Sequence, residues 1–155
     1  MNDTTDPLVA YAVSAAPGHA GDVAPREAWR MLAERPDALL VDVRTTAEWT
    51  YVGGPDVSAL GKDVARVDWQ VFPAMTVNAG FVTALAAIAG APGARPLLML
   101  CRSGVRSAAA AKAMTEAGYT RAFNVKDGFE GPMDPLGRRG GVAGWKAGGL
   151  SWRQS

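Results

Sequence analysis

The chain has 155 residues, enough for one domain with a hydrophobic core of ordinary size. Its 16 Lys and Arg residues nearly balance 15 Asp and Glu residues, so no basic excess favours nucleic acid or an acidic membrane. No apolar run reaches the roughly 18 residues that span a bilayer, and the acidic start lacks the basic segment of a signal peptide. We therefore expect a cytoplasmic protein that binds neither nucleic acid nor membrane. With one cysteine and one histidine, His19, which we expect to be solvated, neither an internal disulfide nor a metal site is predicted.

Residues 1–21 are rich in Ala, Pro, Gly and Asp without apolar periodicity, which is typical of a flexible leader. Residues 22–155 are predicted to form one domain. Its first helix is expected in "DVAPREAWRMLAE", with Asp22 as the cap and a proline in the first turn. "ALLVDV" (38–43) is a continuous apolar run that ends in an acid, which is typical of a strand buried on both faces.

Strands and helices alternate through the rest of the domain. In chain order we expect a strand at 64–72, a helix from Asn78 to Gly90, a strand at 96–100, an alanine-rich helix at 107–118 and a strand at 121–125. From Lys126 on the chain is glycine-rich, with Trp145 and Trp152 as expected anchors. The predicted fold class is α/β: a three-layer, doubly wound parallel sheet with helices on both faces.

The single cysteine, Cys101, directly follows the apolar run "PLLML". A cysteine after four apolar residues is usually an inert core residue. Here, however, it lies at the carboxyl end of a predicted parallel strand, where open sheets bind ligands. The next loop leads into a helix, whose first N–H groups and dipole stabilise an anion. We therefore predict that Cys101 is a nucleophile that favours its thiolate form.

The residues after Cys101 suit an anion cradle. Gly104 permits a tight backbone curl, and Ser103 and Ser107 can form hydrogen bonds directed inward. Arg102 and Arg106 add cationic donors for an oxyanion such as a sulfonate, phosphate or arsenate.

These motifs resemble those of single-domain rhodaneses, the thiosulfate sulfurtransferase family. The resemblance rests on "CRSGVRS", on "LLVDVRTTAEW" upstream and on "GYTRAFNVKDGFEG…GWKAGGLSW" downstream, and it runs from about Asp22 to Trp152. It implies that Cys101 accepts a sulfane sulfur as a persulfide, which the loop amides cradle. The matching loop positions are Arg102, Ser103, Gly104, Val105 and Arg106.

The resemblance also implies supporting roles for Asp42, Arg44 and Glu48. Arg44 and Glu48 would be structural partners, because a separation of four residues suits a salt bridge on a helix. Asp42 would brace the active loop. Two stretches depart from the family pattern: "GGPDVSALGKDVARVDW" after the acid, and "PMDPLGRRGGVA" before "GW". We expect both to shape the rim of the pocket.

The predicted function is therefore sulfur transfer. A small anionic donor such as thiosulfate would load Cys101, and cyanide or an external thiol, including one on a partner protein, would remove the sulfur. No cofactor is implied. A sulfur-relay or interaction module with little turnover of its own is the alternative. A cysteine phosphatase or arsenate reductase is disfavoured, because Arg106 follows Cys101 as C-x4-R and not as the longer C-x5-R of cysteine phosphatases.

Overall fold

The computed structural model describes residues 11–154. The helices are α1 (Pro25–Glu34), α2 (Thr46–Tyr51), α3 (Phe81–Ala89), α4 (Val105–Glu116) and a short 3-10 helix, η3 (Ser58–Leu60). The strands are β1 (Val13–Ser14), β2 (Gly21–Val23), β3 (Leu39–Asp42), β4 (Gly54–Pro55), β5 (Ala65–Arg66), β6 (Gln70–Val71), β7 (Thr76–Val77), β8 (Leu97–Leu100), β9 (Ala122–Val125) and β10 (Trp152–Arg153). In the part of the chain from 11 to 154, no helix is long and apolar enough to cross a membrane.

The central sheet has the strand order β1-β2-β9-β8-β3-β5. Every pair within it is parallel except the edge pair β1–β2, which is antiparallel. Strand β8, which leads to Cys101, lies between β3 and β9 and is fully buried. The α/β class with a largely parallel sheet is therefore confirmed. Two small antiparallel pairs, β4–β10 and β6–β7, lie outside this sheet.

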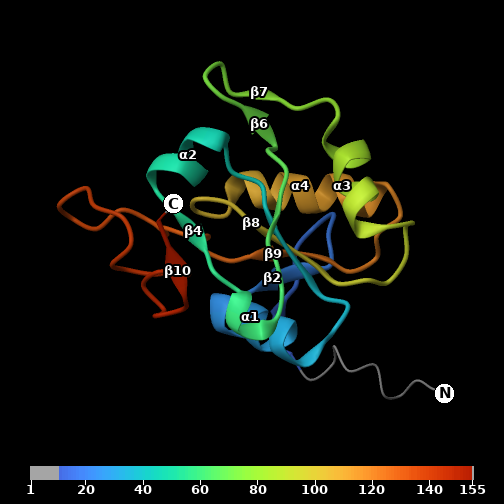
Figure 1. The fold of residues 1–155 in the computed structure, drawn as a ribbon, viewed down its shortest axis with the longest axis horizontal. Coiled ribbons are helices and arrows are strands. Elements are labelled where there is room, and N and C mark those ends of the chain that lie inside the picture. The colour runs from blue at the N-terminus through green and yellow to red at the C-terminus, as the bar shows by residue number, and fades with distance from the viewer. Residues whose placement is uncertain (1–10, 155) are drawn as a thin grey trace.

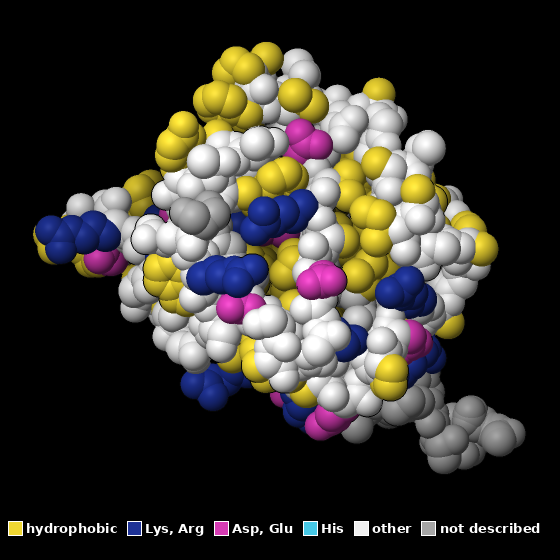
Figure 2. All heavy atoms as spheres, in the orientation of Figure 1, with side chains coloured by type: hydrophobic (Ala, Val, Ile, Leu, Met, Phe, Trp, Pro, Cys, Tyr) yellow, Lys and Arg dark blue, Asp and Glu magenta, His cyan; other side chains and the backbone are white. Residues whose placement is uncertain are grey.

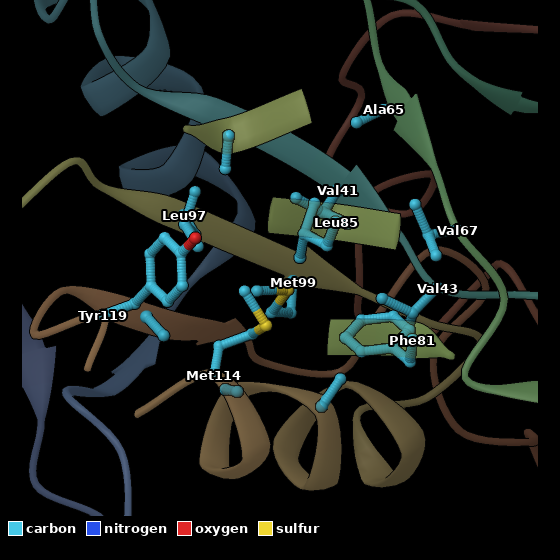
Figure 3. Packing of buried hydrophobic residues seen from close by; sticks show 14 of the residues in the cluster. Val41, Val43, Ala65, Val67, Phe81, Leu85, Leu97, Met99, Met114 and Tyr119 are labelled. Atoms are coloured by element: carbon cyan, nitrogen blue, oxygen red, sulfur yellow. The ribbon is translucent and has the colours of Figure 1, made fainter. Parts of the chain in front are cut away.

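Helices cover both faces of the sheet, so the three-layer prediction is correct (Figure 1). Successive side chains of a strand point to opposite faces. In β8, Leu98 and Leu100 pack with buried residues of α1, whereas Leu97 and Met99 pack with those of α3 and α4. Figure 3 shows the core between the sheet and helices α3 and α4. Phe81 and Leu85 of α3 and Met114 of α4 point toward the sheet there, where they meet Val41, Val43 and Met99.

The N-terminal boundary differs from the prediction. Strands β1 and β2 complete the sheet, and the Tyr11 ring is buried while its hydroxyl donates to Glu34 Oε1 at 2.6 Å. The expected leader is therefore wrong for residues 11–21; residues 1–10 lie outside the described part of the chain. Asp22 lies in β2, so it does not cap α1, whose N-cap residue is Ala24.

Two other predicted elements are displaced. The strand expected at 64–72 is split: β5 joins the central sheet, and β6 turns back as a hairpin with β7. Helix α3 starts after Gly80, and the Asn78 side chain accepts a hydrogen bond from the Gly80 N–H in the turn before it. Its end at Gly90 is as predicted.

The two expected tryptophan anchors differ in burial. Trp145 is fully buried, and its indole N–H donates to the Ser151 carbonyl at 2.8 Å. Trp152 is 38% exposed and packs against the Phe129 ring at a centroid distance of 6.0 Å. The glycine-rich C-terminal segment is thus held to the domain by one core residue and one residue at the surface.

Candidate active site

Cys101 lies at the base of a pocket of about 380 Å³ at the carboxyl end of β8. Only 1% of the residue is exposed. The pocket is lined by Glu48, Gln70, Met75, Cys101, Arg102, Ser103, Val105 and Arg106. The predicted loop residues Arg102, Ser103, Val105 and Arg106 therefore do surround the cysteine. Gln70 and Met75, from the β6–β7 hairpin, were not predicted.

Two groups among the described residues lie within hydrogen-bonding distance of the cysteine sulfur. The Gly104 N–H donates to Cys101 Sγ at 3.0 Å, and the Ser107 Oγ lies 3.1 Å from the same sulfur. Gly104 is the N-cap residue of α4 and has φ +108°, a conformation that glycine adopts without strain. Because α4 begins at the next residue, its positive end faces the sulfur, as the sequence predicted.

The segment "GFEG" (128–131) holds the backbone of the active loop. The Phe129 N–H donates to the Cys101 carbonyl at 2.7 Å, and the Glu130 and Gly131 N–H groups both donate to the Arg102 carbonyl at 3.0 Å. At Gly128, φ is +68°, and an added Cβ would lie 2.5 Å from the Cys101 carbonyl oxygen. This position therefore requires glycine, and the close approach fixes where the loop starts.

The expected pair between Arg44 and Glu48 is not formed. Glu48 instead forms two hydrogen bonds with Arg106, at 2.7 Å (Nη1–Oε1) and 2.9 Å (Nη2–Oε2). Glu48 also completes a capping box with Thr45 at the start of α2. The i,i+4 rule fails because Arg44 precedes the helix, which begins at Thr46. Arg106 is thus anchored by a carboxylate and is not free to take an anion alone.

This ion pair shifts both pKa values. Burial is the largest single influence on Glu48 and opposes its ionisation, but the hydrogen bonds and charge of Arg106, together with Thr45, hold the pKa of Glu48 below its ordinary value. The hydrogen bonds with Glu48 raise the pKa of Arg106 despite burial. Both groups therefore stay charged over the physiological range.

Arg44 pairs with Asp42 in the core. Arg44 Nε and Nη2 donate to Asp42 Oδ1 at 2.9 Å and Oδ2 at 2.7 Å, and both side chains are fully buried. Arg44 Nη2 also donates to the Gly53 carbonyl at 2.7 Å, and its guanidinium lies over the Phe129 ring. Asp42 forms its hydrogen bonds with Arg44, and the direct backbone contacts to the active loop come from 128–131, so any bracing of the loop by Asp42 is indirect. The Asp42–Arg44 pair joins β3 to Phe129, which contacts that loop.

A buried polar residue on β9 was also missed. Asn124 accepts a hydrogen bond from the Ser107 hydroxyl at 2.5 Å, through Oδ1. In the sequence it interrupts the apolar run "RAFNV", and a polar residue in a buried strand is a usable signal of a polar partner.

A parallel sheet whose central strand ends in a cysteine, followed by a loop and a helix start, is the arrangement of rhodanese-like domains, and comparisons with known proteins support this fold. The family profile described as STR4 middle domain matches residues 20–155. The chain belongs to this family.

The chain is also similar to several known proteins. "Uncharacterized protein RC0915" of Rickettsia conorii is 35% identical over 127 residues, which cover 82% of this chain and 92% of that protein. "Protein THYLAKOID RHODANESE-LIKE, chloroplastic" of Oryza sativa subsp. indica is 33% identical and covers 85% of this chain and 25% of that protein. The solved structure of Rv0390 from M. tuberculosis has a TM-score of 0.79 and 49% identity, covering 86% of this chain and 97% of that one.

Proposed function

We propose that the protein is a sulfurtransferase that carries a sulfane sulfur on Cys101 as a persulfide. The observation that carries the proposal is the Gly104 N–H at 3.0 Å from Cys101 Sγ, at the start of α4 and at the base of an open pocket. An amide and a helix N-terminus stabilise the thiolate, which is the nucleophilic form of cysteine.

The reaction has two displacement steps. The Cys101 thiolate attacks the outer sulfur of thiosulfate; a sulfur–sulfur bond forms, and the bond to the sulfonate sulfur breaks with its electron pair, releasing sulfite. An acceptor nucleophile then attacks the outer sulfur of the persulfide, and Cys101 leaves again as a thiolate. Cyanide would give thiocyanate, and a thiol would give a new persulfide. Because Cys101 is the only cysteine, the accepting thiol comes from another molecule.

Arg102 is the cation best placed to hold the departing sulfite. Its side chain is exposed at the pocket, and it forms no ion pair with any residue from 11 to 154. Arg106, by contrast, is committed to Glu48. The contribution of Arg102 should therefore be largely electrostatic and weaken with added salt.

Turnover of thiosulfate and cyanide by wild type, Cys101→Ser and Arg102→Ala tests the proposal. We expect no turnover by Cys101→Ser and a reduced rate by Arg102→Ala. Added salt screens the Arg102 charge, so the difference in rate between wild type and Arg102→Ala should shrink as the salt concentration rises. Full turnover by Cys101→Ser would overturn the proposal. Cys101-dependent hydrolysis of an aryl phosphate would favour a phosphatase, and sulfur loading without turnover would favour a relay module.

A further inference from the structure

A chain of polar side chains, all buried except the 30% exposed Asp22, runs from the active loop to the N-terminal segment of the domain. Ser107 Oγ lies 2.5 Å from Asn124 Oδ1, and Asn124 Nδ2 donates to Asp22 Oδ1 at 3.1 Å. His19 Nε2 lies 3.0 Å from the same Asp22 oxygen. Ser107 is fully buried, Asn124 is 6% exposed, and the His19 side chain is 6% exposed, not solvated as the sequence suggested.

The orientation of the Asn124 amide follows from Asp22. An ionised carboxylate accepts hydrogen bonds and donates none, so the Asn124 atom beside it is the nitrogen. The amide oxygen therefore faces Ser107. His19 contacts Asp22 Oδ1 on the other side, so this carboxylate oxygen is held between the imidazole and the amide.

The Ser107 hydroxyl has one hydrogen and two close neighbours. The amide oxygen of Asn124, at 2.5 Å, is a stronger acceptor than a thiol sulfur at 3.1 Å, so the hydrogen points toward Asn124. The hydroxyl hydrogen cannot reach both neighbours, so while Cys101 is protonated Ser107 Oγ, 3.1 Å from the sulfur, presents its lone pairs to the thiol. In this arrangement Ser107 stabilises the thiol, whereas the Gly104 N–H is left as the donor to a thiolate.

We propose that His19, Asp22 and Asn124 are positioning residues that withhold the Ser107 hydroxyl hydrogen from Cys101 and thereby restrain the reactivity of the thiol. A flip of the Asn124 side-chain amide would bring its nitrogen next to Ser107, and the Ser107 hydroxyl hydrogen would then be released toward the sulfur. The flip would also place the amide oxygen against the Asp22 carboxylate, and the repulsion between these two acceptors disfavours the flipped amide. The inference concerns the cysteine of the proposed sulfur transfer, but it does not require the transfer to occur.

The rate of alkylation of Cys101 by iodoacetamide at fixed pH tests the inference, and the whole signal comes from one cysteine. In Asn124→Leu the competing acceptor is gone, so Ser107 donates to the sulfur. We expect alkylation to accelerate roughly two- to fourfold, because a hydrogen bond from Ser107 to the sulfur stabilises the reactive thiolate form. Asn124→Asp keeps an acceptor and adds negative charge, so alkylation should slow. A general loosening of the fold would instead move both variants in the same direction.

A second pair of variants tests whether the effect passes through Ser107. In a Ser107→Ala background, Asn124→Leu should leave the alkylation rate unchanged, whereas a structural disturbance would persist. Asp22→Ala and His19→Ala, which lie farther from the sulfur, should give smaller accelerations that also require Ser107. If Asn124→Leu does not fold, Asp22→Ala with and without Ser107→Ala answers the same question. Rates that do not rise in the folded variants, or that rise equally without Ser107, would overturn the inference.

Failure of this inference can be distinguished from failure of the proposed function. Alkylation reports the state of the thiol and needs neither sulfur donor nor acceptor. A protein that shows the expected alkylation pattern but no sulfur transfer would retain the inference and lose the proposed function. A protein that transfers sulfur but lacks the expected alkylation pattern would retain the proposed function and lose the inference.

Discussion

Glu48 and Arg106, 58 residues apart in the sequence, are joined by two hydrogen bonds at the edge of the pocket that contains Cys101. The pair links α2 to the first turn of α4, and both side chains are mostly buried, with exposed fractions of 17% and 14%. The apolar side chains Val71, Phe72 and Val77 are exposed on the nearby β6–β7 hairpin, where hydrophobic atoms gather (Figure 2). The hairpin itself reaches the Cys101 pocket through Gln70 and Met75, beside the charged Glu48–Arg106 pair.

Replacing Arg106 by Ala should lower the rate of sulfur loading by roughly ten- to a hundredfold, the size expected of an uncompensated charge near the reacting anion. The reason is that the Glu48 carboxylate would be left unpaired beside the anionic donor. Arg106→Lys keeps the charge but loses the two-pronged geometry, so it should recover only part of the rate. Thiosulfate kinetics measure the effect. The matched control is Glu48→Gln with Arg106→Ala, which removes the unpaired charge and should be faster than Arg106→Ala alone; equal rates would show that this carboxylate is not the cause.

The Glu48–Arg106 pair should make the free energy of unfolding of the domain decrease at acidic pH. Burial opposes ionisation of Glu48, but the Arg106 and Thr45 hydrogen bonds outweigh it and hold the pKa below the ordinary 4.5. A carboxyl whose pKa is lower in the folded state stabilises the fold above its unfolded value, and this contribution is lost as the pH falls through the folded value. Denaturant unfolding of wild type and Glu48→Gln at neutral pH and at about pH 3 measures it. We expect the advantage of the wild type to shrink at the lower pH; a constant difference would contradict the prediction.

Removing one partner of the buried Asp42–Arg44 pair should strongly lower the free energy of unfolding. Asp42→Ala leaves a fully buried guanidinium whose remaining side-chain hydrogen bond among residues 11–154 is to the Gly53 carbonyl, with the Phe129 ring beside it. We expect a loss of about 3–5 kcal/mol in the free energy of unfolding, and a smaller loss when both residues are replaced by Leu or Met. Urea titration of the three proteins provides the comparison. A double variant as unstable as Asp42→Ala would mean that the unpaired charge is not responsible.

Residues 11–20 should contribute to stability. Burial is the largest influence on Tyr11 and, together with its hydrogen bond to Glu34, raises the pKa of Tyr11 to about 12. Tyr11→Phe keeps the ring but removes this bond, at a cost of about 1 kcal/mol. Removing residues 1–20 also deletes β1 and His19, so we expect a clearly lower melting temperature than for removal of residues 1–10. Equal melting temperatures for the two truncated proteins would restore the view of residues 11–20 as a leader.

Local patterns in the sequence were sufficient for the parts of the site that lie on consecutive residues. The apolar run before Cys101, the glycine at 104 and the helix that follows are adjacent in the chain, and their geometry depends on short-range preferences. The glycine-rich segment marked both Trp145 and Trp152 as anchors, but only Trp145 is buried, so the pattern alone does not tell which tryptophan enters the core.

Contacts between distant segments could not be predicted in this way. The partner of Glu48 lies 58 residues away, and the partner of Asn124 lies 102 residues away at Asp22. Side-chain spacing along one helix says nothing about such pairs, because the sheet topology brings their elements together. The N-terminal segment was mistaken for a leader because β1 has only two residues, too few for a periodic pattern.

The most direct test of the account is the intact mass of the protein after incubation with thiosulfate. We predict that the wild-type chain gains the mass of one sulfur atom, that cyanide removes it, and that Cys101→Ser gains nothing under the same conditions. A wild-type chain that gains no sulfur from either thiosulfate or inorganic polysulfide, or a Cys101→Ser chain that gains as much as the wild type, would contradict the assignment of Cys101 as the sulfur carrier.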